Sequence, residues 1–162
     1  MYSLTARRRA RQRRRAAHET AAAVVREALR HGDVECIEDL VPAVEEMIGR
    51  PVALYTGDLP LDQVAFTTSG ANGAEIVLAE HCATRQHTLA HEIGHLVLGH
   101  RHGSVAVTTP PPGCEEVFDS LHRELAREAA RNEREAEVFA ARLLEIVPAR
   151  GGAEVEWREA MG

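Results

Sequence analysis

The chain has 162 residues, enough for one domain with its own hydrophobic core. It contains no run of about 18 apolar residues that could cross a membrane, and its basic start lacks the apolar core of a secretory signal. The formal net charge of −6 is unevenly distributed, because seven of the 19 basic residues lie between Arg7 and Arg15 and the rest of the chain carries 12 basic minus 25 acidic residues, or −13.

The first predicted elements are a charged arm and two helices. The basic stretch, residues 1–16, is expected to form a solvated and mobile arm, because a dense block of like charges repels itself. From Ala16 to His31 the sequence is typical of a helix, which Gly32 ends. A second helix is expected from Val34 to Ile48, where Pro42 either kinks it or marks its first turn.

Three short extended segments follow. Residues 51–55 and 64–69 are rich in residues that favour strands, and residues 74–79 return after the turn sequence GANG, Gly70 to Gly73. The last two segments are therefore predicted to form a β-hairpin.

Two further helices complete the predicted fold. One should run from Arg85 to Leu98, and a second from Glu115 to Ile146, where apolar residues recur every three or four positions. Between them, residues 103–113 contain three consecutive prolines and should form a stiff extended connection. Residues 149–162 are expected to be weakly ordered. The expected fold class is α+β, helix-rich, with a small sheet before the helix that begins near Arg85.

The cysteines give an indication of the cellular compartment. Cys36, Cys82 and Cys114 are odd in number and widely spaced. This pattern favours reduced thiols in a cytoplasmic protein over a disulfide framework. Cys82 precedes the next motif closely enough to approach a metal, but a small buried apolar side chain is the simpler interpretation.

The motif HEIGH, His91 to His95, carries the first functional signal, although an HExxH match arises by chance in roughly one such chain in twenty. On a helix, His91 and His95 lie on one face about 5–6 Å apart, so both can bind one Zn²⁺ ion. Glu92 points beside the open position of the metal, where it can act as a general base. Two surface histidines are the alternative, but the apolar neighbours Leu89 and Ile93 indicate a core-facing helix, where polar groups need a partner.

A catalytic zinc needs a third protein ligand. The metzincin pattern would require glycine at position 98 and histidine at 101, but the chain has Leu98 and Arg101 there. A glutamate from the last helix is the other common solution. Glu133 is the favoured ligand, and Glu137, on the same side, is the favoured acceptor that orients a ligand imidazole. Both could instead belong to a solvated stripe paired with nearby arginines, which is the preferred interpretation of Glu135.

Three small residues indicate how closely these two helices approach. Gly94 costs about 1 kcal/mol inside a helix relative to alanine. It would allow another backbone, or a substrate, to come close to the histidine face. Ala136 and Ala140, in line with Glu133, would likewise let the last helix pack closely.

Two motifs in order, RQHTLAHEIGHLVLGH and EREAEVFAARLLEIVP, resemble the ImmA/IrrE family of zinc-dependent metallopeptidases. The likeness extends over about residues 18–148 and implies a zincin-like metallopeptidase domain at 17–148. By the resemblance, His91 and His95 match the ligand pair, Glu92 the catalytic residue and Glu133 the third ligand.

The resemblance also carries implications for function. The family usually has Asn or Asp where this chain has Glu137. The resemblance implies a cytoplasmic zinc endopeptidase that cleaves a helix-turn-helix transcriptional repressor and so induces a mobile element or a stress response. The residue that stabilises the oxyanion is left open among Tyr55, His100 and His102. The alternative function is a non-proteolytic, metal-stabilised regulator that sequesters a transcription factor.

The arginine run, Arg7 to Arg15, has several interpretations. Its charge is compatible with weak, sequence-independent contact to nucleic-acid phosphates. It is equally compatible with a solubilising tail or a partner-docking peptide. No aromatic residue accompanies the run, so base stacking is not indicated.

Overall fold

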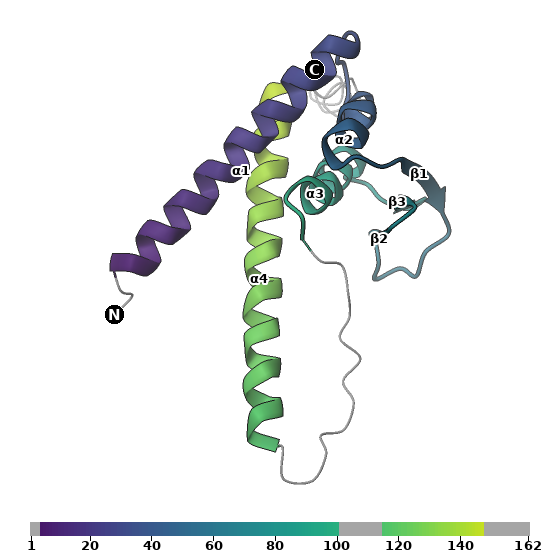
Figure 1. Cartoon of the computed structure of the whole chain (residues 1–162). Helices are drawn as coiled ribbons and strands as arrows, with labels where there is room; N and C mark the ends of the chain where they lie inside the picture. Colours follow the sequence, from purple (N-terminus) through teal and green to yellow (C-terminus); the bar gives the residue numbers. More distant parts are fainter. Residues whose placement is uncertain (1–3, 101–114, 148–162) are drawn as a thin grey trace, which may run out of the picture.

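The computed structural model describes residues 4–100 and 115–147, which form a mixed α+β fold. In chain order the elements are α1 (Leu4–His31), the 3₁₀ turn η1 (Ile37–Leu40), α2 (Val41–Ile48), β1 (Val52–Gly57), β2 (Ala65–Gly70), β3 (Gly73–Ala79), α3 (Arg85–Val97) and α4 (Glu115–Ile146). Helix α3 lies between α4 and the small sheet (Figure 1). None of the helices in the described part combines the length and the apolar character needed to cross a membrane.

The sheet has the strand order β1-β3-β2, with β3 parallel to β1 and antiparallel to β2. Gly70 pairs with Gly73 at the end of the β2–β3 hairpin, so the predicted hairpin is confirmed. Ala74, Ile76 and Leu78 are buried on one face of β3, and α3 covers the sheet. Among the described strands, none pairs with the outer edge of β2.

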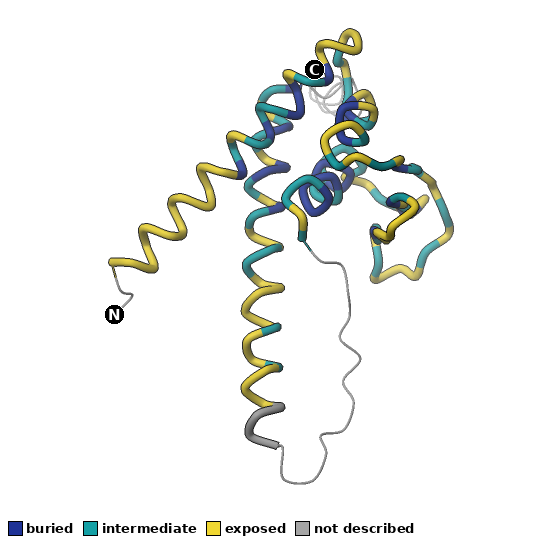
Figure 2. The backbone as a smooth tube through the Cα atoms, in the orientation of Figure 1, coloured by how far each residue is buried: buried dark blue, intermediate teal, exposed yellow. Residues whose placement is uncertain are grey.

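The first helix differs from the prediction. Helix α1 begins at Leu4 rather than Ala16, so residues 4–16 of the expected arm are helical and the predicted start of the first helix was wrong. Arginine is a good helix former, and carboxylates offset part of the charge. Arg15 Nε donates to Glu19 Oε1 at 2.7 Å, one turn along, and Arg13 Nη1 donates to Glu135 Oε1 of α4 at 2.9 Å. Residues 4–16 are exposed, as expected of a charged segment (Figure 2).

The second helix was predicted from Val34 to Ile48, but α2 begins only at Val41, so its predicted start was wrong, whereas α3 and α4 agree closely with their predicted bounds. Pro42 lies in the first turn of α2, preceded by the 3₁₀ turn, so it marks a helix start rather than a kink. Helix α3 ends near its predicted position, and Gly99 just after it has a φ of +69°. The predicted proline-rich connection at residues 103–113 and the tail at 149–162 lie outside the described residues.

The core lies where α1, α3 and α4 meet. Helix α4 packs against both α1 and α3, while α2 packs against α1 and α3 from the other side (Figure 1). Alanines on α1 and α4 keep these helices close. The fully or almost fully buried residues of the two helices are Ala17, Ala21, Val24, Ala28, Ala136, Phe139, Ala140 and Leu143. This packing fixes the position of α4 along α3, and it therefore determines which glutamates of α4 lie next to α3.

The first half of α4 extends away from this core. Residues 119–130 are exposed or partly exposed (Figure 2). Among them, Leu121 is 52% exposed. The apolar stripe predicted for the whole helix therefore has two environments. Its second half is buried against α1 and α3, whereas its described first half has no such cover.

Gly94 marks the closest approach of α3 and α4. A Cβ atom at this position would lie 2.9 Å from Phe139 Cδ1 and 3.3 Å from Ala136 Cα. Both distances are below ordinary van der Waals separation, and the second atom is backbone, so it cannot rotate away. The expectation that Gly94 admits another backbone is therefore confirmed.

Gly94→Ala is expected to lower the free energy of unfolding by about 1–3 kcal/mol, because the added methyl group overpacks the α3–α4 contact. The measurement is urea denaturation followed by circular dichroism. Gly32→Ala is the matched control: no atom lies within 4 Å of its added Cβ, so its stability should be unchanged or slightly higher. Equal stabilities of the two variants would show that the close contact is not tight.

Candidate metal centre

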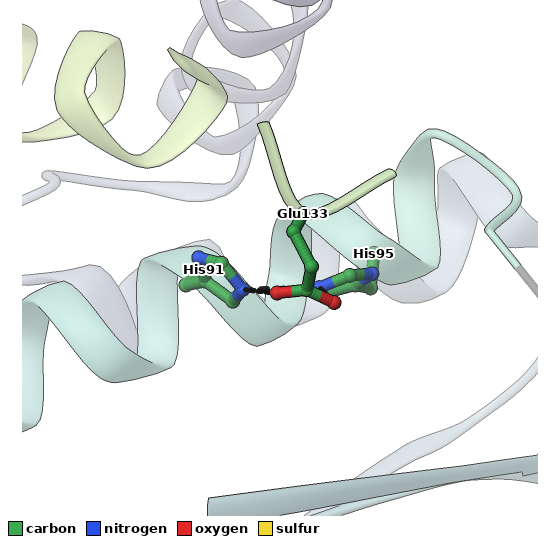
Figure 3. A group of neighbouring side chains, drawn as sticks. All are labelled: His91, His95 and Glu133. Atoms are coloured by element: carbon green, nitrogen blue, oxygen red, sulfur yellow. Dashed lines mark hydrogen bonds and ion pairs between the residues drawn. The ribbon is translucent and has the colours of Figure 1, made fainter. Parts of the chain in front are cut away.

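Helix α3 positions the two histidines of the HEIGH motif. Leu89, Ile93 and Leu96 are buried in the core, which fixes the rotation of the helix. His91 and His95 then lie one turn apart on the side that meets α4 (Figure 3). The His95 side chain is 8% exposed and that of His91 is 20% exposed, so the pair lies at the edge of the core.

Glu133 reaches from α4 onto the two imidazole rings (Figure 3). Its Oε2 lies 3.2 Å from His91 Nε2 and its Oε1 lies 3.4 Å from His95 Nε2. The two Nε2 atoms are 3.0 Å apart. The three side chains thus bring one carboxylate and two imidazole nitrogens to a single point.

The three ligand atoms fit a zinc ion. Tetrahedral ligands at about 2.0–2.1 Å from Zn²⁺ lie about 3.3 Å from one another. His91 Nε2 lies 3.0 Å from His95 Nε2 and 3.2 Å from Glu133 Oε2, and the other oxygen of Glu133, Oε1, lies 3.4 Å from His95 Nε2. Two imidazoles and one carboxylate also form a donor set that zinc uses in catalytic sites. The Glu133 side chain is 62% exposed, so this group opens to solvent on one side.

Glu137, one turn further along α4, contacts the outer nitrogen of His91. Its Oε2 lies 3.4 Å from His91 Nδ1, and its Oε1 lies 3.1 Å from Nε2 of His87. With Nε2 of His91 directed at the metal position, Nδ1 carries the hydrogen and can donate it to Glu137, which fixes the ring. The sequence spacing predicted this contact for Glu137, but it did not predict that His87 also contacts the Glu137 carboxylate.

His95 is supported by a longer chain of contacts. Its Nδ1 lies 3.1 Å from Nδ1 of His100, whose Nε2 lies 3.5 Å from Glu135 Oε2. The other oxygen of Glu135 accepts the hydrogen bond from Arg13. If His95 binds through Nε2, its Nδ1–H donates to His100, and the hydrogen of His100 then lies on Nε2, the atom that is 3.5 Å from Glu135 Oε2.

The interpretation of Glu135 as part of a solvated stripe was therefore wrong. Its side chain is 19% exposed and its partners are Arg13 and His100, not the arginines of its own helix. Helical spacing reveals neighbours within α4, whereas Arg13 is 122 positions away. His100, one of the candidates for the oxyanion role, lies behind His95 rather than on the side of the ligand atoms.

Glu135→Gln is expected to weaken zinc binding by about threefold to tenfold. Removing a direct hydrogen-bond partner of a metal ligand lowers metal affinity by about 10–100-fold. The effect of Glu135 should be smaller, because it contacts the ligand His95 only through His100. Competition with a chromophoric chelator measures the affinity. Glu145→Gln is the control, because Glu145 is exposed on α4 and pairs with Arg142. Equal affinities of the two variants would show that the contact chain does not support His95.

Glu92 lies on the sheet side of α3. The hydroxyl of Thr67 on β2 donates a hydrogen bond to Glu92 Oε2 at 2.6 Å. Thr67 is 8% exposed and lies opposite Ile76 on the buried face of the sheet. One carboxylate oxygen of Glu92, which follows His91 in the chain, is therefore held in place by Thr67. No motif or spacing marks Thr67, because its contact with Glu92 joins two residues that lie 25 positions apart on different elements.

The remaining candidates lie elsewhere. Tyr55 is 52% exposed on β1, at the opposite edge of the sheet from Thr67, and His102 is outside the described residues. Cys82 is half-buried, with its Sγ 3.3 Å from Thr88 Oγ1, and it is not part of the ligand group. Cys36 and Cys82 are free thiols, and burial raises the pKa of the Cys36 thiol.

A second group of potential ligands in the described residues consists of Glu27, His31 and Glu46. It lies on the surface near the C-terminal end of α1. Glu27 already accepts a hydrogen bond from Arg30 at 2.7 Å, and His31 Nε2 lies 3.1 Å from Glu46. Ordinary surface ion pairing explains this group, because none of its three members is buried.

The chain was also compared with known proteins. The comparisons with protein-family models, curated proteins and solved structures each found no match, so the case for a function rests on the geometry of the site.

Proposed function

We propose that this chain is an intracellular zinc-dependent endopeptidase with a zincin-like site of the ImmA/IrrE type. One observation carries the proposal. His91, His95 and Glu133 each offer one ligand atom within 4.8 Å of the other two, and Glu92, the residue that follows the first histidine, accepts a hydrogen bond from Thr67. This combination is what peptide hydrolysis by a metal site needs.

Each residue of the site then has a chemical role. His91, His95 and Glu133 would hold a zinc ion, which would polarise a carbonyl group and lower the pKa of bound water. Glu92 accepts a proton from the attacking water and passes it to the nitrogen of the leaving amine. The hydroxyl of Thr67 donates a hydrogen bond to Oε2 of Glu92 and so restricts the rotation of the carboxylate, which leaves Oε1 to act as the base.

The neighbourhood of Glu92 favours a peptide as substrate. Thr67 lies on β2, and within the described sheet the outer edge of β2 has no partner strand. An extended peptide can add to such an edge through backbone hydrogen bonds. This would bring a scissile bond next to Glu92. The assignment of a helix-turn-helix repressor as the cleaved protein rests on the resemblance of the two motifs.

The number of ligands favours an enzyme over a non-proteolytic regulator that sequesters a transcription factor. A structural zinc is usually closed by four protein ligands, whereas a catalytic zinc keeps one position open. In the described residues the group contains three ligand side chains. A general base held in place by a threonine would also serve no purpose at a purely structural site.

The direct test is a cleavage assay with the zinc-loaded protein. Purified protein is incubated with a helix-turn-helix repressor, and the products are identified by mass spectrometry. Cleavage at one defined bond is expected, with loss of activity in a chelator and recovery on adding zinc. The absence of any cleavage, with zinc bound and the repressor captured intact, would favour sequestration.

A further inference from the structure

Helices α1 and α4 diverge toward the N-terminal end of α1 (Figure 1). Residues of both helices line a groove of about 770 Å³. The charged residues that line it are Arg9, Arg13 and Arg14 from α1 and Arg131, Arg134 and Glu135 from α4. The proposed hydrolysis requires none of these arginines to touch the reacting atoms. The proposed hydrolysis therefore does not explain why these arginines gather in the groove.

The charge of the groove selects an anionic occupant. Five arginines face one glutamate, which gives five minus one, or +4. The single carboxylate is already engaged by Arg13 and His100. Like charges brought together in a partly enclosed groove repel one another and attract negatively charged groups. An occupant that carries several carboxylates or phosphates would relieve this repulsion.

The uncharged residues that line the groove distinguish an acidic peptide from a nucleic acid as its occupant. Ala6, Ala10 and Val138 give the groove an apolar floor of small side chains. Such a floor suits the apolar face of a helix, since small residues allow close packing. Single-stranded nucleic acid is usually held by stacking its bases on aromatic side chains, and none of the residues that line the groove is aromatic. The floor favours a peptide.

The groove is also joined to the candidate metal centre. Glu135 lines the groove and contacts His100, which in turn contacts His95. On α4, the groove residue Arg134 immediately follows Glu133, which faces the histidines. A protein held in the groove is therefore held on the helix that contributes to the site.

We propose that this groove docks an acidic amphipathic helix of the protein that is cleaved at the metal centre. The docked helix places its apolar face on the alanines and its carboxylates against the arginines of the two walls. This inference rests on the proposed function for the identity of the occupant. The binding step itself needs neither zinc nor cleavage, so it can be tested separately.

The binding test uses the full-length protein and a fluorescent synthetic peptide of about 20 residues, long enough to be helical. The peptide has a leucine face flanked by glutamates. A peptide of the same composition in scrambled order lacks the amphipathic face and has the same charge. Fluorescence anisotropy at about 0.15 M salt, where long-range attraction is screened, should give at least about tenfold tighter binding of the amphipathic peptide.

Matched variants locate the binding surface. The double variant Arg9→Glu/Arg134→Glu reverses one charge on each wall of the groove and should weaken binding by more than about tenfold. The control, Arg8→Glu/Arg123→Glu, makes the same change on the same two helices, at exposed positions that do not line the groove. It should lose much less affinity. Equal losses, or equal binding of the two peptides, would overturn the proposal.

Two further measurements separate this proposal from its competitors. A 20-nucleotide single strand and a duplex of the same length serve as nucleic-acid probes, and groove-dependent binding of either tighter than the peptide would overturn it. Dimerisation of the wild type in light scattering that the groove variant abolishes would also overturn the proposal. In the cleavage assay, the groove variant should raise KM and leave kcat unchanged. Peptide docking without any cleavage would instead contradict the proposed hydrolysis and leave the docking site standing.

Discussion

Replacing Glu92 by glutamine is expected to abolish cleavage of the repressor while zinc binding and the fold stay unchanged. The amide is isosteric with the carboxylate and can still accept the hydrogen bond from Thr67, but it cannot take a proton from water. Loss of a general base lowers a rate by about 10²–10⁴-fold. The measurement is kcat/KM in the cleavage assay, together with zinc content and the thermal unfolding curve.

The control for this variant is Glu75→Gln, an equal change at an exposed position of β3. It should cleave at the wild-type rate. Cleavage by Glu92→Gln at an undiminished rate would remove Glu92 from the chemistry. If both wild type and Glu92→Gln hold the repressor inactive to the same extent, with no product formed, the chain acts by sequestration.

The elements that local sequence determines were predicted well. The β2–β3 hairpin follows from the turn sequence between Gly70 and Gly73, and α3 follows from its apolar spacing and from Gly99. The parallel pairing of β1 with β3 joins segments that are not adjacent in the sequence, and no local pattern specifies it. The strand order therefore had to come from the structure.

The error at the start of α1 has a physical cause. Repulsion among the arginines predicts a mobile arm, but helix propensity and two carboxylate partners favour helix over residues 4–16. The partner of Arg13 lies on α4 and is invisible to a local charge count. The same long-range contact explains why the role of Glu135 was missed.

In the candidate site, too, local spacing could be predicted from the sequence, whereas contacts between distant segments could not. His91 and His95 are four residues apart on one helix, so their convergence could be predicted from spacing alone. Glu133 and Glu137 followed from a pattern on a second helix together with small residues that allow close packing. Thr67, His87 and His100 approach the site from β2, from the start of α3 and from beyond its end. Neither a motif nor a spacing marks these three residues.

Glu133→Ala is expected to weaken zinc binding by more than about 100-fold, because it removes a charged ligand. Residues that only hydrogen-bond to a ligand already contribute about 10–100-fold to metal affinity. At a free zinc concentration about 1000 times the wild-type Kd, zinc stabilises the wild type by about 4.1 kcal/mol, and a 100-fold weaker variant by about 1.4 kcal/mol. For a domain of this size, that difference lowers the Tm of the zinc-loaded form by about 5–10 °C.

The apo forms provide the internal control for this variant. The Glu133 side chain is 62% exposed, so its removal should leave the Tm of the metal-free protein nearly unchanged. Glu137→Ala removes a contact to the outer nitrogen of His91 and should weaken zinc binding by about 10-fold. Glu27→Ala, in the second acidic group, should have no effect. If zinc affinity survives in Glu133→Ala but falls in Glu27→Ala, the ion binds on the surface of α1, and peptide hydrolysis at the histidine pair has no physical basis.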